Sequence, residues 1–198
     1  MHPRPGAQPP EFALPRGGFW IFGYGSLMWN PGFPYVKWSP ALVYGYHRAL
    51  CISSNRWRGT PQRPGLVLGL DRGGACRGIA FLLAQSDVNA TLEMLWAREM
   101  RRHVYVPRVV HARLPDSEVR ALAFIADPRH EAYTGRLSIR ETAARIANCC
   151  GMRGANLDYV ARTVTHLREL GVHDHALQRV LEAARALARH RAESGDAA

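Results

Sequence analysis

The features that this sequence lacks exclude several classes of function. Neither Gly-x-Gly-x-x-Gly nor Gly-x-x-x-x-Gly-Lys-Ser/Thr occurs, so the usual dinucleotide-binding and nucleotide-binding loops are absent. No run approaches about eighteen uninterrupted apolar residues, and we therefore expect no membrane-spanning helix. The four cysteines have no Cys-x-x-Cys spacing, which favours reduced thiols in a cytoplasmic protein over a zinc site, and we expect no metal.

A large excess of positive charge is the main feature of the composition. The chain has 26 lysines and arginines against 16 aspartates and glutamates, for a formal net charge of +10, and this excess raises nucleic acid as a partner. Lys37 is the only lysine, and the arginines run from Arg4 to Arg191 without aromatic residues interleaved in the basic stretches. We interpret the charge as solvated surface and expect no nucleic-acid partner, with nucleic-acid binding kept as an alternative.

The length of 198 residues and the hydrophobic pattern predict one domain of the α+β class over residues 18–191. Proline-rich residues 1–17 have no secretory apolar segment and, with residues 192–198, are expected to be disordered tails. The expected strands, which form a sheet that curls or closes before about residue 136, are 19–24, 41–53, 66–70, 76–84, 105–114 and 122–126. The expected C-terminal helices are 138–150, 156–170 and 175–191.

A glycine-rich turn follows the first expected strand. The apolar residues 19–22 lead into Gly23-Tyr24-Gly25-Ser26-Leu27-Met28. Glycine permits a positive φ and a close approach of backbone to ligand, so successive amide N–H groups can converge on one negative group, and the serine hydroxyl adds a further donor. The turn is therefore a candidate carboxylate or oxyanion cradle, and the alternative is a simple tight turn after a buried strand.

A carboxylate lies on the apolar face of the one helix expected among the strands. Ser86 is the expected N-cap, and the apolar face is formed by Val88, Leu92, Leu95 and Trp96. Glu99 is four residues from Leu95 on that face, whereas Glu93 and Arg98 are expected to point elsewhere. Since acidic side chains are rarely buried without a partner or a task, Glu99 is a candidate functional carboxylate. Two alternatives remain open: the helix frays near Glu99, or Arg98 or Arg101 pairs with it.

Five short motifs together resemble the ChaC-type γ-glutamylcyclotransferase family over about residues 19–175. They are Phe22-Gly23-Tyr24-Gly25-Ser26-Leu27-Met28-Trp29, Gly45-Tyr46-His47-Arg48, Arg58-Gly59-Thr60-Pro61-x-x-Pro64-Gly65, Arg98-Glu99 and Gly154-x-Asn156-x-x-Tyr159. The resemblance implies a small mixed β-barrel with flanking helices and a helical C-terminal part. It also implies a cofactor-free reaction on glutathione, whose γ-glutamyl group closes to 5-oxoproline while cysteinylglycine leaves.

The resemblance also assigns roles to residues of this sequence. Glu99 is implied as the catalytic acid/base and Tyr159 as a pocket residue, and the γ-glutamyl part of the substrate is expected to be held by Gly23, Tyr24, Gly25, Ser26, Leu27 and Met28. This sequence departs from the family pattern at residues 100–105, which lack the usual glycine pair, and at Leu66, where an arginine is common. The alternatives are another γ-glutamyl amine or γ-glutamyl amino acid as substrate, or a binding module without catalysis.

Overall fold

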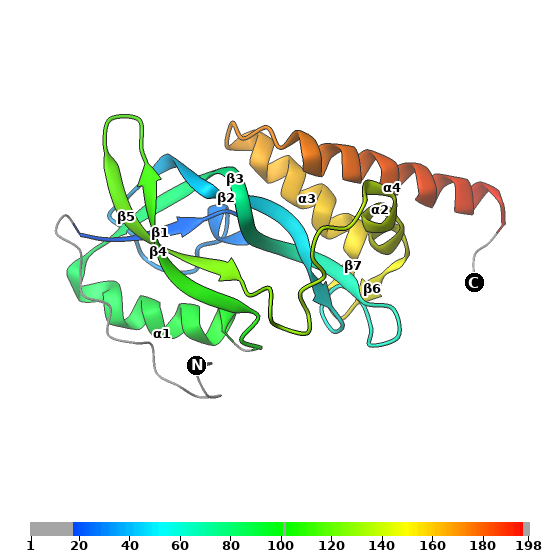
Figure 1. The fold of residues 1–198 in the computed structure, drawn as a ribbon, viewed down its shortest axis with the longest axis horizontal. Helices are drawn as coiled ribbons and strands as arrows, with labels where there is room; N and C mark the ends of the chain where they lie inside the picture. Colours follow the sequence, from blue (N-terminus) through cyan, green and yellow to red (C-terminus); the bar gives the residue numbers. More distant parts are fainter. Residues whose placement is uncertain (1–17, 101, 196–198) are drawn as a thin grey trace. The chain divides into compact units, whose positions relative to one another are not determined.

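The computed structural model describes residues 18–100 and 102–195 (Figure 1), which fall into two compact units. The first unit comprises residues 18–48 and 69–130, and the second comprises residues 49–68 and 131–195. The expectation of one domain over residues 18–191 stays a prediction. Within the described residues, no helix is both long enough and apolar enough to cross a membrane.

Five strands form a closed barrel in the order β1, β3, β2, β4, β5. Their bounds are Phe19–Gly23 for β1, Lys37–Ser54 for β2, Gly65–Leu83 for β3, Tyr105–Arg113 for β4 and Glu118–Ala126 for β5. Strand β1 pairs antiparallel with β3 and parallel with β5, and β4 pairs antiparallel with both β2 and β5. The mixed barrel and the α+β class are as predicted.

The interior of the first unit explains why β1 is apolar throughout. All five of its residues are buried, and because side chains alternate across a strand, Trp20 and Phe22 point to one face while Ile21 points to the other. Trp20 and Phe22 belong to one core cluster with alternate residues of β5, which are Ala121, Ala123 and Ile125. A strand that is buried on both faces is a continuous hydrophobic run, which is the pattern seen in the sequence.

Helix α1 (Val88–Glu99) packs outside this barrel and carries the candidate carboxylate at its last residue. The predicted apolar face is buried, and Trp96 meets Phe124 of β5 with ring centroids 6.0 Å apart. The predicted N-cap is wrong, because a short 3-10 helix (Gln85–Asp87) precedes α1 and makes Asp87 the cap residue.

The second unit contains three packed helices and a two-stranded hairpin. The bounds are Ile139–Asn148 for α2, Cys150–Gly151 for β6, Gly154–Ala155 for β7, Asn156–Glu169 for α3 and His175–Glu193 for α4. Helix α4 packs against both α2 and α3. It extends two residues beyond the predicted end at Arg191, whereas residues 1–17 and 196–198 lie outside the described part of the chain. All four cysteines are free thiols, with Cys51, Cys76 and Cys149 buried and Cys150 exposed.

One predicted break in the sheet is wrong. The sequence Asp71-Arg72-Gly73-Gly74 predicts a turn between two strands, but β3 runs continuously through it. Gly73 and Gly74 have φ values of 92° and 71°, and these conformations let an extended strand bend locally without ending. The side chain of His47 on β2 hydrogen-bonds the carbonyl oxygen of Gly73 at 3.0 Å. The two glycines therefore mark a local distortion within a long strand.

Candidate functional site

The turn after β1 contains a short 3-10 helix, Ser26–Met28. The amide of Met28 donates to the carbonyl oxygen of Gly25 at 2.9 Å, which closes the turn. The amides of Ser26 and Leu27 begin the helix and so have no acceptor inside it, and no partner for them is found in the described part of the chain. The predicted cradle thus has two consecutive backbone amides without a partner in the described residues, and its role in ligand binding stays a prediction.

Gly23 serves this turn through close packing and not through a positive φ, so the conformational reason expected from the sequence is wrong. Neither Gly23 nor Gly25 has a positive φ, and the φ of Gly25 is −138°. A Cβ atom on Gly23 would lie 3.1 Å from the Cβ of Leu27 and 3.4 Å from the amide nitrogen of Met28. The absence of a side chain at Gly23 therefore lets the chain fold tightly back on itself.

Two residues hold Tyr24, near the start of the turn, in place. The buried hydroxyl of Tyr24 donates to the carbonyl oxygen of Phe124 on β5 at 2.7 Å. The guanidinium of Arg48 donates to the carbonyl oxygen of Tyr24 and, at 2.7 Å, to that of Arg77. The side chains of Tyr24, Leu27 and Met28 are all buried, so any contact that they make to a ligand is most readily a backbone contact. Arg48 belongs to one of the sequence motifs, but no local pattern indicated its contact with the turn.

Glu99 is a mostly buried carboxylate at the end of α1. Its side chain is 19% exposed, so it is largely withdrawn from water but can still be reached. The helix does not fray before Glu99, because the amide of the following residue, Met100, donates to the carbonyl oxygen of Trp96 at 2.9 Å. The position of Glu99 is therefore fixed by regular helical geometry.

Arg98 connects Glu99 to the turn. Its Nε atom is 3.1 Å from Oε1 of Glu99, and its Nη2 atom donates to Oγ of Ser26 at 2.9 Å. The expectation that Arg98 points elsewhere is wrong, and the alternative that an arginine pairs with Glu99 is correct. Burial raises the pKa of the Glu99 carboxyl, and the Arg98 guanidinium partly opposes this rise. The site thus has a carboxylate with a raised proton affinity, held by the same cation that contacts the turn.

Tyr159, the remaining predicted site residue, lies on α3 in the second unit. Its hydroxyl oxygen accepts from the amide of Leu68 at 3.3 Å, and the guanidinium carbon of Arg58 lies 4.9 Å from the centre of its ring. The structure therefore brings together the turn and Glu99 within the first unit, and it places Tyr159 among residues of the second.

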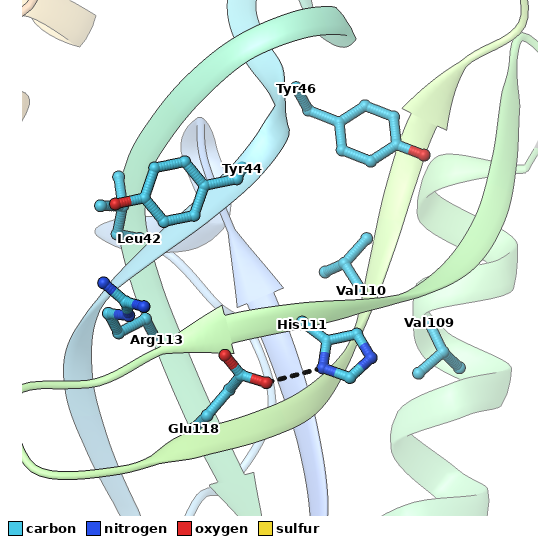
Figure 2. A pocket seen from close by; sticks show the side chains of 8 residues that line it. All are labelled: Leu42, Tyr44, Tyr46, Val109, Val110, His111, Arg113 and Glu118. Carbon is cyan, nitrogen blue, oxygen red and sulfur yellow. Dashed lines mark hydrogen bonds and ion pairs between the residues drawn. The ribbon is translucent and has the colours of Figure 1, made fainter.

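A separate pocket of about 280 Å³ opens on β2, β4 and β5 (Figure 2). Within it, Nδ1 of His111 lies 2.8 Å from Oε1 of Glu118. The pocket is lined by Leu42, Tyr44, Tyr46, Val109, Val110, His111, Arg113 and Glu118. None of the predicted site residues lines this pocket, so it does not carry the chemistry expected from the sequence.

Comparison with known proteins identifies the family. The sequence model of the family described as ChaC-like protein matches residues 19–187, which include both the turn and Glu99. The chain belongs to the ChaC-like γ-glutamylcyclotransferase family.

The relatives of this ChaC-like chain cover most of its length. A protein of Escherichia coli (strain K12) named glutathione-specific γ-glutamylcyclotransferase is 37% identical over 84% of this chain and 72% of its own. A protein of Danio rerio named glutathione-specific γ-glutamylcyclotransferase 1 is 34% identical over 81% of this chain and 85% of its own. A crystal structure of a γ-glutamyl cyclotransferase specific to glutathione from yeast has a TM-score of 0.79 at 22% identity, covering 87% of this chain and 98% of its own. That structure supports the fold.

One departure of this ChaC-like chain from the family pattern has a structural setting. Leu66 is fully buried in the second unit, and its backbone is held by the side chain of Asn156. The amide of Leu66 donates to Oδ1 of Asn156 at 2.6 Å, and Nδ2 of Asn156 donates to the carbonyl oxygen of Leu66 at 2.8 Å. Leu66 is thus a core residue here, and its side chain is not exposed to a ligand.

Proposed function

We propose that this chain converts glutathione to 5-oxoproline and cysteinylglycine. The observation that carries the proposal is the mostly buried carboxylate of Glu99, linked through Arg98 to a turn with open backbone donors. The names of the relatives at 37% and 34% identity support glutathione as the substrate. We also propose that the reaction takes place in the cytoplasm, since the four cysteines are free thiols.

The reaction is a cyclisation within the substrate. The α-amine of the γ-glutamyl group attacks its own γ-carbonyl carbon, a new carbon–nitrogen bond closes the five-membered ring, and the bond to the cysteine nitrogen breaks. Because nucleophile and electrophile are already tethered, no serine or cysteine nucleophile is needed. Well-oriented intramolecular reactions of this kind reach effective molarities of ~10⁵–10⁸ M.

Proton transfer is the task proposed for Glu99. An α-amino group with a pKa of about 7.7–8.0 is mostly protonated near neutrality, so a base must remove a proton before the nitrogen can attack. The ionised carboxylate takes that proton, and the Glu99 carboxyl then gives it to the departing cysteine nitrogen. The attacking nitrogen loses a second proton as the ring closes, and the released cysteinylglycine amine takes up this proton, so that the protons balance. A raised pKa suits both steps, because the carboxyl must accept and release one proton near working pH.

The turn is proposed to hold the γ-glutamyl end of the substrate. The open amides of Ser26 and Leu27 are suited to a ligand carboxylate or to the oxyanion that develops at the γ-carbonyl. Preorganised donors at such an oxyanion typically lower the barrier by ~2.7–4 kcal/mol. Tyr159 is retained as a proposed substrate-contacting residue.

The test is turnover by the purified chain, read as release of 5-oxoproline and cysteinylglycine by mass spectrometry. Glu99→Gln is expected to lower kcat by about 10²–10⁴-fold, since it removes proton transfer. Its affinity for glutathione, measured by calorimetry, should stay close to that of the parent. Glu93→Gln, on the exposed face of the same helix, is the matched control and should keep full activity. Tyr159→Phe is expected to raise KM with little change in kcat.

The same assay separates the alternatives. Faster 5-oxoproline release from γ-glutamyl amines or other γ-glutamyl amino acids would move the substrate away from glutathione. Binding of glutathione without turnover of any substrate in the panel would indicate a binding module. Near-parental turnover by a folded Glu99→Gln variant would contradict the role of this carboxylate.

A further inference from the structure

The guanidinium of Arg98 uses all three of its nitrogens to bind two segments of the first unit. Nη2 donates to Oγ of Ser26 at 2.9 Å, and Nη1 donates to the carbonyl oxygens of Asn30 at 2.9 Å and Pro31 at 3.2 Å. Nε lies 3.1 Å from Oε1 of Glu99. One side chain therefore connects the carboxylate at the end of α1 to Ser26 within the turn and to the backbone of the two residues 30 and 31 just after it.

The direction of the contact with Ser26 follows from the chemistry of arginine. A guanidinium has only donors, so Oγ of Ser26 must accept from it. The hydroxyl proton of Ser26 is then directed away from Arg98 and is available to a ligand acceptor. Arg98 thereby makes Ser26 a donor, like the open amides beside it.

We infer that Arg98 is a positioning residue that holds the Glu99 carboxylate and the Ser26 hydroxyl in one frame, so that base and substrate cradle keep a fixed spacing. This inference rests on the proposed function, because it assigns Arg98 a task in the same reaction. Arg98 acts through Glu99 and the turn and takes up no proton itself.

The contact set requires arginine specifically. A lysine has one nitrogen on a flexible stem and cannot reach three acceptors of the turn and the carboxylate from a planar fork. Both side chains of the pair are partly withdrawn from water, with exposed fractions of 27% for Arg98 and 19% for Glu99, so the pair is less screened than a surface ion pair. Lysine at this position therefore keeps the charge and loses the geometry.

The effect of the Arg98 charge on Glu99 can be measured separately from the effect of the Arg98 hydrogen bonds, because a substitution can keep the charge and remove the bonds. Besides Glu99, Arg98 binds the hydroxyl of Ser26 and the backbone carbonyls of Asn30 and Pro31, and none of these groups is charged. Arg102 and His103 follow α1. Among the described residues, Arg98 is the charged group that lowers the pKa of Glu99.

The experiment compares Arg98→Lys, Arg98→Gln and the exposed control Arg189→Lys on α4, each checked for folding by circular dichroism and thermal melting. With glutathione as substrate, Arg98→Lys is expected to lower kcat at least about 10-fold, because even a small misplacement of reacting groups can cost about 100-fold. Its acid limb in the pH profile should stay near the parental position. Arg98→Gln is expected to move that limb upward by about one pH unit, because the neighbouring cation that favours the ionised carboxylate is gone. Arg189→Lys should match the parent.

A folded Arg98→Lys variant with kcat within twofold of the parent would overturn the inference, because the charge alone would then suffice. This result is distinct from failure of the proposed function, in which the parent itself shows no turnover. In that case the titration of Glu99 decides: carboxyl-¹³C NMR of the parent and of Arg98→Gln, with the signal assigned by Glu99→Gln. An upward shift of the Glu99 pKa in Arg98→Gln supports the contact in solution, and an unchanged pKa overturns it.

Discussion

Glu99 experiences two opposing influences on its titration. Burial at the end of α1 raises the pKa of the carboxyl, and the Arg98 guanidinium acts in the other direction, with burial the larger influence. The folded protein therefore holds a proton on Glu99 more tightly than the unfolded chain does. A residue of this kind reduces stability at neutral pH, which is a common consequence of keeping an ionisable group at a functional site.

The raised pKa of Glu99 predicts how the stability of the fold changes with pH. A carboxyl with a raised folded-state pKa stabilises the fold fully below its unfolded-state pKa, and this stabilisation is lost as pH rises through the folded-state value. Since glutamine resembles the neutral form, Glu99→Gln is expected to raise Tm by about 2–4 °C at pH 8, which is the shift that ~1 kcal/mol gives in a chain of this size. The gain should vanish toward pH 4.

Melting curves of the parent, Glu99→Gln and the control Glu93→Gln across this pH range are the measurement. Glu93 lies on the exposed face of α1, so its replacement should leave Tm nearly unchanged at every pH. A Glu99→Gln variant that melts below the parent at pH 8 would mean that the pair with Arg98 stabilises the fold more than burial of the carboxylate destabilises it.

The start of α3 holds the start of β3 in place through the buried side-chain amide of Asn156. Asn156 is fully buried, and its side chain satisfies both the amide and the carbonyl of Leu66. Gly65, the residue before Leu66, adds a steric constraint. A Cβ on Gly65 would lie 2.2 Å from the carbonyl oxygen of Arg58 and 2.5 Å from Oδ1 of Asn156. These two motif residues therefore have a structural task in the second unit.

Replacing Asn156 tests this task. Asn156→Ala is expected to lower the free energy of unfolding by ~2–4 kcal/mol, because each buried backbone group of Leu66 left without a partner costs ~1–3 kcal/mol. Urea unfolding followed by far-ultraviolet circular dichroism is the measurement. Asn89→Ala, at an exposed position on α1, is the control and should change little. A loss below 0.5 kcal/mol, on the order of a surface substitution, would show that Leu66 finds other partners.

What the sequence predicts correctly depends on how local the cause is. The apolar face of α1 follows from spacings of three or four residues and is present. The sequence Ser138-x-x-Glu141 likewise predicts a capping box, and the structure has one at the start of α2. Such a box is predictable because its two partners are three residues apart. The predicted turn at Asp71-Arg72-Gly73-Gly74 is wrong because pairing with neighbouring strands decides whether a glycine pair ends a strand or bends it.

For the candidate site, the sequence located the turn and the carboxylate but not their connection. The contacts of Arg98 with Ser26 and of Arg48 with Tyr24 join residues 72 and 24 positions apart, and no periodic pattern encodes such pairs. The motifs contained both arginines without indicating what they bind. The roles of Glu99, of the turn and of Tyr159 stay predictions.

The net charge of +10 raises the question of whether the chain binds a negatively charged partner such as nucleic acid. Several arginines make contacts within the fold. The guanidinium carbons of Arg56 and Arg153 lie 4.9 Å and 4.5 Å from the ring centre of Trp57, and Arg48 donates to backbone carbonyls. Cations engaged with aromatic rings and carbonyls are less available to phosphates. The absence of a nucleic-acid partner stays a prediction.

The corresponding prediction is weak, sequence-independent binding to nucleic acid. Fluorescence anisotropy with labelled duplex and single-stranded DNA at physiological salt is expected to give Kd values no tighter than the ~10⁻⁴–10⁻⁶ M typical of non-specific association. Nanomolar affinity that falls steeply with added salt would contradict this and would restore nucleic acid as a partner.

The distribution of the four thiols has a practical consequence. Cys150 is exposed on the short hairpin strand β6, whereas the other three cysteines are buried, and burial raises the pKa of the Cys149 thiol further from the reactive thiolate form. The native chain therefore carries a single attachment point for a maleimide fluorophore or a spin label. Spectroscopy on the second unit can begin from that point without first removing competing cysteines by mutagenesis.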